Sequence, residues 1–245
     1  MANLAGKVAL VTGGGQGVGQ GIALALASEG VAVTITGRTL AKVEETARMI
    51  AERGGKALPL AGNVKDAADL AAMVDQTVAT FGGLDILVNN AQEVPLGKLE
   101  DVTDEAFIAG FESGPLATHR LMKLARPHMA ARGGGTIFNL CSSAAIRWDM
   151  TGYGAYAAVK QAIRSLTRAA AAEWGREGIR VLTIAPHAES PGLKYWLEAN
   201  PEEARAFFKT IPLGRIGKLE EDIGRAIVAL CGQDLGYLTD RKSVV

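Results

Sequence analysis

Short apolar runs alternate along the chain with longer stretches in which apolar residues recur at helical spacing. Such short, continuous runs are typical of strands that are buried on both faces of a parallel sheet. We expect strands at residues 8–11, 31–36, 56–61, 84–88, 136–140 and 179–184, and a seventh over 236–245. The alternation of strands and helices predicts an α/β fold with a doubly wound parallel sheet of the Rossmann type.

Helices are expected after the first strand and over 40–53, 66–81, 104–131, 156–177 and 220–230. Asp66 is a candidate N-cap, because its carboxylate can accept free backbone N–H groups of the first helical turn. Pro115 is expected to bend the long helix. The chain has no internal repeat and no Pro- or Ser-rich linker, so we interpret residues 1–245 as one domain with a helical insertion over 191–210.

A cluster of glycines separates the first strand from the first helix. Glycine leaves its backbone amides unobstructed, and the following helix directs the positive end of its dipole toward them. Within a strand–turn–helix unit, this arrangement indicates a site for the pyrophosphate of a nucleotide. The glycines of the cluster are Gly13, Gly14, Gly15, Gly17 and Gly19.

The residues after the second strand bear on which nucleotide is bound. In nicotinamide-binding folds, an acidic residue about 20 positions after the glycines accepts hydrogen bonds from the adenosine ribose and would repel a 2′-phosphate. Residues 31–40 contain no acid but contain Arg38, whose guanidinium group suits a phosphate. A solvated loop arginine is the alternative. With the glycine cluster upstream we favour the phosphate, and therefore predict NADP(H) as the cofactor.

The composition excludes several classes of partner. Lys plus Arg and Asp plus Glu both number 26, so we predict no nucleic-acid or anionic membrane surface. No run approaches the roughly 20 apolar residues of a membrane span, and a cytoplasmic location is expected. The two cysteines and three histidines lack metal-ligand spacing, so no metal site is expected. These residues are Cys141, Cys231, His119, His128 and His187.

Three residues in the second half of the chain are candidates for proton chemistry. Tyr156 and Lys160 are four apart near the start of an expected helix, so they share one face. A nearby ammonium group would lower the pKa of the tyrosine from about 10 toward neutrality, which suits a general acid or base. Ser143 follows a strand at the carboxyl edge of the sheet, where its hydroxyl could hold a carbonyl oxygen. An exposed helical pair is the alternative for the tyrosine and lysine.

Taken together, several motifs resemble the short-chain dehydrogenase/reductase family. They are TGGGQGVG at 12–19, NNA at 89–91, a serine at 143 followed by YAAVK at 156–160, PLGRIG at 212–217 and YLT at 237–239. The resemblance covers nearly the whole chain. It implies an oxidoreductase that transfers a hydride between NADP(H) and a carbonyl or alcohol substrate.

The resemblance also implies roles for individual residues. Tyr156 would pass a proton to the substrate oxygen, Lys160 would hold the nicotinamide ribose, and Ser143 would orient the substrate. A homotetramer or homodimer is expected, with Leu116, Leu121, Leu124, Ile163 and Leu166 on the helices that pair across subunits. The implied cofactor-binding residues are Gly13, Gly15, Gln16, Gly17, Val18, Gly19, Arg38, Asn63, Val64, Asn90, Tyr156, Lys160 and Ser190.

Several positions depart from the family pattern. Ser113 or Gly114 stands where the family usually has an asparagine that supports a water chain to the lysine, so the proton relay is expected to differ. The usual NNAG reads NNAQ, which puts Gln92 beside the expected cofactor path. His187 follows a proline where the family usually has glycine, and it is expected at the active-site mouth.

The substrate is not predicted from the sequence, but candidate contacts are. Trp148, His187, Tyr195 and Trp196 are expected to line the substrate pocket, with burial in the core as the alternative for the aromatic residues. Two other functions stay open. One is a catalytically silent nucleotide-binding sensor or scaffold, which the missing asparagine favours. The other is a non-redox lyase or epimerase with Tyr156 as its acid or base.

Overall fold

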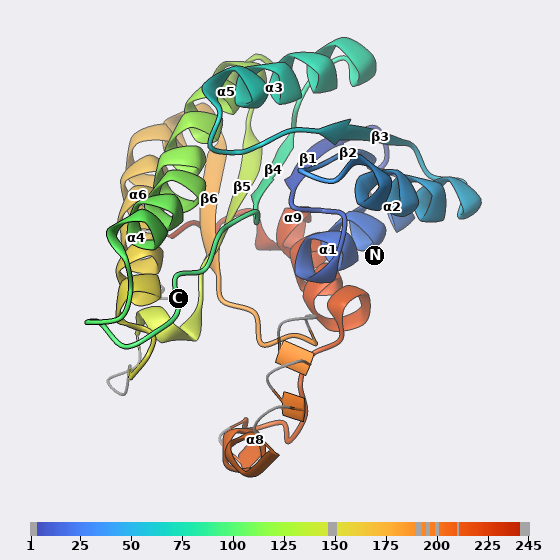
Figure 1. Cartoon of the computed structure of the whole chain (residues 1–245). Helices are drawn as coiled ribbons and strands as arrows, with labels where there is room; N and C mark the ends of the chain where they lie inside the picture. The colour runs from blue at the N-terminus through green and yellow to red at the C-terminus, as the bar shows by residue number, and fades with distance from the viewer. Residues whose placement is uncertain are drawn as a thin grey trace.

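Six parallel strands form one sheet in the computed structural model of the protein, which describes residues 4–146, 151–189, 193–194, 197–198, 201–209 and 211–240 (Figure 1). The strand order is β3-β2-β1-β4-β5-β6, and every neighbouring pair is parallel. The strands are β1 (Val8–Thr12), β2 (Ala32–Gly37), β3 (Ala57–Ala61), β4 (Ile86–Asn89), β5 (Gly135–Leu140) and β6 (Ile179–Ile184).

Helices cover both faces of the sheet (Figure 1). One layer contains α1 (Gly17–Ser28), α2 (Leu40–Glu52) and α9 (Arg225–Cys231), which follows the π-helical turn η4 (Leu219–Gly224). The other contains α3 (Ala67–Phe81), α4 (Asp104–Phe111), the π-helical turn η1 (Glu112–Leu116), α5 (Ala117–Ala131) and α6 (Gly154–Trp174). Three short 3-10 turns are η2 (Ser143–Ala145), η3 (Gly175–Glu177) and η5 (Gln233–Leu235). Helix α8 (Pro201–Lys209) stands away from the sheet at the lower edge of the view.

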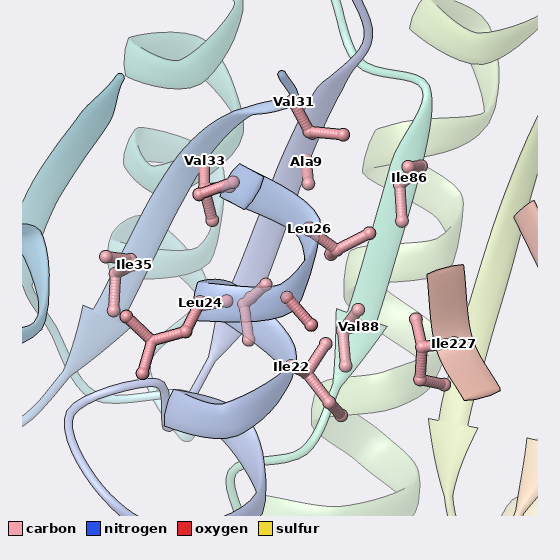
Figure 2. Packing of buried hydrophobic residues seen from close by; sticks show 14 of the residues in the cluster. Ala9, Ile22, Leu24, Leu26, Val31, Val33, Ile35, Ile86, Val88 and Ile227 are labelled. Atoms are coloured by element: carbon pink, nitrogen blue, oxygen red, sulfur yellow. The ribbon is translucent and has the colours of Figure 1, made fainter. Parts of the chain in front are cut away.

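The alternation of side chains along each strand builds two hydrophobic clusters, one on each face. Ala9 of β1 lies on the α1 side, where Ile22 and Leu26 project toward the strands (Figure 2). Leu10 lies on the opposite side, in a cluster with residues of α3, α5 and α6. Burial of each Leu or Ile side chain stabilises the folded chain by about 1.5–3 kcal/mol. The central strands are therefore covered on both faces, as their continuous apolar runs predict.

The topology creates a crevice at one edge of the sheet. From β1 the chain turns toward β2 and β3, whereas from β4 it turns toward β5 and β6. Because β1 and β4 are adjacent and parallel, their following loops diverge at the carboxyl edge. Open α/β sheets bind ligands at such a point.

The predicted α/β sheet is confirmed, and most elements begin and end close to their expected positions. Asp66 caps α3 as expected, because its Oδ1 accepts hydrogen bonds from the backbone N–H groups of Ala68 (2.7 Å) and Asp69 (3.2 Å). The expected bend near Pro115 takes the form of η1, a π-helical turn that joins α4 to α5. None of the helices in the described ranges is long and apolar enough to cross a bilayer.

The expected seventh strand is wrong over residues 236–240, which form no strand in the structure. The chain approaches the sheet there, and the backbone N–H of Asp240 donates to the carbonyl oxygen of Val181 (3.0 Å), but the contact does not extend into a ladder over the described residues. Residues 241–245 lie outside the described residues.

Two of the residues expected at a subunit interface face the chain's own core. Leu121 is 1% exposed and Ile163 is 2% exposed, so neither can reach a partner subunit. Leu124 and Leu166 are partly buried against the cluster under α5 and α6. Leu116 is 38% exposed on η1. Of the five expected residues, Leu116 is therefore the most exposed.

Candidate active site

A cavity of about 550 Å³ lies at the carboxyl edge of the sheet, between the loops that follow β1 and β4. It brings together residues from both halves of the chain. Eleven of the expected cofactor-binding residues line it, namely Gly13, Gly15, Gln16, Gly17, Val18, Arg38, Asn63, Val64, Asn90, Tyr156 and Lys160. The cavity therefore joins the expected phosphate, adenosine and proton-transfer residues in one space.

The glycine loop is packed so tightly that a Cβ would come within 3.0 Å of another atom at four positions, namely Gly13, Gly14, Gly15 and Gly19. Gly13 has a φ of +65°, and a Cβ there would lie 2.8 Å from Asn90 Nδ2. A Cβ on Gly19 would lie 2.5 Å from the carbonyl oxygen of Gly13. No side chain caps α1, since Gln16 Oε1 instead accepts a hydrogen bond from Lys42 Nζ (2.7 Å). The bare loop and uncapped helix N-terminus fit the pyrophosphate of a dinucleotide.

Asn90 and Thr12 hold the glycine loop against the end of β4. Asn90 Nδ2 donates to the carbonyl oxygens of Thr12 (2.9 Å) and Gly13 (3.2 Å). Thr12 Oγ1 in turn accepts from the backbone N–H groups of Asn90 (3.0 Å) and Ala91 (3.1 Å). The side-chain amide of Asn90 therefore braces the loop, in addition to lining the cavity.

At the far end of the cavity, Arg38 forms an ion pair that the sequence analysis did not anticipate. Arg38 Nη1 lies 3.3 Å from Glu93 Oε1, and Lys65 Nζ lies 3.2 Å from the same oxygen. Asn63 is fixed nearby, because its backbone N–H donates to Asp69 Oδ2 (2.8 Å). The sequence signal that could have indicated this ion pair is the position of Glu93, four residues after the end of β4 and so at the carboxyl edge of the sheet.

Lys160 lies on the floor of the cavity and is 4% exposed. Its ammonium group donates to the carbonyl oxygen of Leu140 (2.6 Å) and lies 5.6 Å from the centre of the Tyr156 ring. Burial lowers the pKa of Lys160 to about 8. The lysine side chain therefore gains or loses its proton close to pH 8.

The expected lowering of the Tyr156 pKa by Lys160 does not occur in this structure. Burial raises the pKa of Tyr156, and a hydrogen bond with the Ser142 side chain only partly opposes this effect. Lys160 directs its ammonium group to a backbone carbonyl, so the loss of solvent around the phenol dominates. The tyrosine side chain is therefore held as a neutral phenol, the form that can donate a proton.

The two neighbouring serines point to different partners. Ser142 lines the cavity, and its side chain acts to lower the pKa of Tyr156, whereas the spacing in the sequence favoured Ser143. Ser143 Oγ lies 2.9 Å from His187 Nε2. His187 is exposed. The structure thus places Ser142, which caps the turn η2, in the same cavity as Tyr156, and the role of Ser143 stays a prediction.

Three of the positions that depart from the family pattern, Ser113, Gly114 and Gln92, lie close together. Ser113 Oγ accepts from the backbone N–H of Glu93 (2.9 Å) and donates to the carbonyl oxygen of Ala109 (2.7 Å). Gly114 has no side chain, and a Cβ there would lie 3.3 Å from Gln92 Cδ. Gln92 lines the cavity, and its buried Nε2 has no hydrogen-bond partner among the described residues. Gln92 thus carries a buried donor for which the described residues supply no acceptor.

Other expected site residues fall elsewhere. Trp148, Ser190, Tyr195 and Trp196 lie outside the described residues. Gly19 supports the loop from behind without lining the cavity. A second hollow of about 800 Å³ lies beside the insertion, and its lining includes Leu193, Phe208, Arg215 and Asp222. Among the described residues, no group of three or more His, Cys, Asp or Glu side chains is arranged to hold a metal ion.

A doubly wound parallel sheet with a bare glycine loop at its switch point defines a dinucleotide-binding α/β protein. Comparison with known proteins specifies the class further. The model of a family described as enoyl-(acyl carrier protein) reductase matches residues 13–245. The chain is 37% identical over 245 residues to a 12α-hydroxysteroid dehydrogenase of Clostridium sp., covering 96% of this chain and 93% of that protein.

Further relatives agree. A cyclohexanol dehydrogenase of Acinetobacter sp. is 32% identical, with 98% of this chain and 93% of that protein covered. A solved 7α-hydroxysteroid dehydrogenase, in complex with NADH and 7-oxo glycochenodeoxycholic acid, matches with a TM-score of 0.90 at 29% identity over 97% of this chain and 92% of that one. The chain belongs to the short-chain dehydrogenase/reductase family, whose members are oxidoreductases that use nicotinamide cofactors.

Proposed function

We propose that the protein transfers a hydride between NADP(H) and a small carbonyl or alcohol substrate, with Tyr156 as the general acid or base. One observation carries this proposal: Tyr156, Ser142 and Lys160 meet in the cavity whose other end is the glycine loop. A nucleotide held by that loop would share the cavity with the tyrosine. The proton donor and the hydride carrier are then next to the same substrate.

The residues of the cavity fit a nicotinamide dinucleotide. The loop over 13–19 would hold the pyrophosphate, Asn63 and Val64 would contact the adenine, and Lys160 would hold the nicotinamide ribose. The buried Nε2 of Gln92 needs an acceptor, which a bound cofactor has in its ribose and amide oxygens. When bound, the cofactor gives or accepts the hydride. Arg38 favours the 2′-phosphorylated form.

Tyr156 acts as the proton donor in the direction of reduction. Its raised pKa keeps the phenol protonated, so the Oη proton can move to the carbonyl oxygen of the substrate as that oxygen becomes negative. Ser142, which lines the same cavity as Tyr156, holds the same oxygen. Oxidation of an alcohol follows the reverse path.

The substrate class follows from the relatives together with the apolar residues near the cavity. The named relatives act on hydroxysteroids and on cyclohexanol. Val94 lines the cavity and is 50% exposed, and Leu96 two residues later is 55% exposed. An apolar rim of this kind suits a secondary alcohol or ketone on a hydrocarbon ring. The homotetramer or homodimer and the cytoplasmic location stay predictions.

The test is turnover of NADPH with cyclic ketones, and of NADP⁺ with the matching alcohols, in the wild type and in Tyr156→Phe. We expect Tyr156→Phe to lower kcat/KM by roughly 10²–10⁴-fold. The matched control is Tyr153→Phe, because Tyr153 is 37% exposed and neighbours the site. Binding of cofactor without turnover of any alcohol or ketone would contradict the proposal. That result would favour a sensor or a non-redox lyase or epimerase.

A further inference from the structure

We propose that Glu93 is a specificity-determining residue that weakens binding of the 2′-phosphate by occupying the cations which that phosphate needs. The inference rests on the proposed function, since it concerns the adenosine end of the same cavity. Glu93 would thus set the relative affinities of the protein for the phosphorylated and the unphosphorylated cofactor.

A single carboxylate oxygen of Glu93 bridges two cations. Glu93 Oε1 lies 3.3 Å from Arg38 Nη1 and 3.2 Å from Lys65 Nζ. Arg38 and Glu93 both line the cavity, together with Asn63 and Val64. The bridge joins the loop after β2 to the segment after β3, and these are the two segments expected to hold the adenosine.

Hydrogen bonds keep the backbone of Glu93 and of Lys65 in place. The buried Ser113 hydroxyl accepts from the backbone N–H of Glu93 (2.9 Å). Lys65 donates its backbone N–H to Asn63 Oδ1 (3.1 Å) and accepts from Arg120 Nη1 (3.1 Å). The fold therefore holds the backbone from which both side chains extend, and the ion pairs set the position of the carboxylate.

A 2′-phosphate carries more negative charge than a carboxylate and has more acceptor oxygens. If it approaches Arg38, it meets a guanidinium group that is already paired with Glu93, and it is repelled by the carboxylate. The side chains of Arg38 and Glu93 are 71% and 33% exposed, so the pair can open. Because exposed ion pairs contribute only about 0.2–1 kcal/mol, the phosphate can win this competition at a reduced affinity. A 2′-hydroxyl is neutral and meets no such repulsion.

The experiment compares the dissociation constants of NADPH and NADH for the wild type and Glu93→Gln. We expect Glu93→Gln to bind NADPH roughly fivefold more tightly, while its affinity for NADH changes less than about twofold. The matched control is Glu45→Gln, which removes the same charge from an exposed pair with Arg48 on α2, outside the cavity. In an Arg38→Ala background, the gain from Glu93→Gln should shrink.

The outcomes separate this inference from the proposed function. If Glu93→Gln leaves the ratio of NADPH to NADH affinity unchanged, the inference is wrong although the proposed function stands. A similar change in Glu45→Gln would show a general charge effect and overturn it too. Loss of NADH affinity in Glu93→Gln would show that the carboxylate holds the ribose instead. If none of the proteins binds either nucleotide, both proposals fail.

Discussion

Lys160 donates a hydrogen bond to the carbonyl oxygen of Leu140 across 2.6 Å, and this contact fastens the start of α6 to the carboxyl end of β5. The position of the lysine is therefore set by the sheet, with Tyr156 one helical turn earlier on the same face. The backbone of a strand therefore holds the Lys160 ammonium group in place beside the tyrosine proposed as the acid or base.

The buried lysine gives stability an unusual dependence on pH. Burial lowers its pKa from 10.5 to about 8 in the folded chain. Between these values the unfolded chain binds the proton more tightly, so the free energy of unfolding rises with pH. Relative to Lys160→Met, the wild type should gain roughly 2–3 kcal/mol between about pH 7 and pH 10 in urea unfolding. Parallel pH profiles of the two proteins would contradict this.

The two serines give a second prediction. Ser142→Ala should lower kcat/KM by roughly 10²–10³-fold, because it removes the hydroxyl beside Tyr156. Ser143→Ala should change kcat/KM by less than about tenfold, since Ser143 Oγ contacts His187 instead. Steady-state kinetics of both variants with one substrate decides the matter. A larger loss in Ser143→Ala would support the choice that the sequence spacing favoured.

Gly19→Ala should damage the cofactor loop. The added Cβ would lie 2.5 Å from the carbonyl oxygen of Gly13 and 2.6 Å from Asn90 Nδ2. We expect a loss of about 1–3 kcal/mol in the free energy of unfolding and weaker cofactor binding by titration. Gly175→Ala is the control, because nothing lies within 4 Å of its Cβ and its φ of −56° suits alanine. Equal effects in the two variants would refute the steric argument.

Asp85 should contribute strongly to stability away from the site. It is 3% exposed and accepts from Lys7 Nζ (3.0 Å), Arg132 Nε (3.0 Å) and the backbone N–H of Val8 (2.9 Å). Burial raises its pKa, but these hydrogen bonds outweigh burial and the pKa is lowered overall. Asp85→Asn should therefore cost roughly 3 kcal/mol at neutral pH by urea unfolding.

The pH dependence of that loss provides a check. A lowered carboxyl pKa stabilises the folded chain above the unfolded pKa, and this contribution is lost as the pH falls. The difference between wild type and Asp85→Asn should shrink below about pH 4. Asp75→Asn, on the exposed face of α3, should have little effect at any pH. A pH-independent loss in Asp85→Asn would mean that packing, and not the charge, is what matters.

The strands and the glycine loop could be predicted because local sequence determines them. Buried parallel strands need apolar runs such as Val8 to Val11, and a turn with Gly13 at positive φ needs glycine. The cap at Asp66 follows from one side chain and the turn beside it. These features depend on neighbours in the chain.

The rest depends on contacts between distant segments. Sequence spacing cannot tell which of Ser142 and Ser143 lines the cavity, because the conformation of the turn η2 sets the directions of both side chains. The pairing of Glu93 with Arg38 joins residues 55 positions apart. The raised pKa of Tyr156 reflects burial by several elements, which no four-residue motif contains. The missing strand over 236–240 likewise depends on how the chain end meets β6.

The π-helical turn at Glu112–Leu116 acts as a phase shift within one long helix. One extra residue rotates every later side chain by roughly 100° relative to an uninterrupted α-helix. This rotation directs Leu121 and Ala125 into the core below the sheet while Ser113, inside the turn, stays available to Glu93. Deleting a single residue from the turn would therefore misalign α5 with the sheet. The same deletion would remove the hydrogen bond by which Ser113 holds the backbone of Glu93. The packing of α5 and the proposed selection of cofactor therefore depend on the same irregular turn.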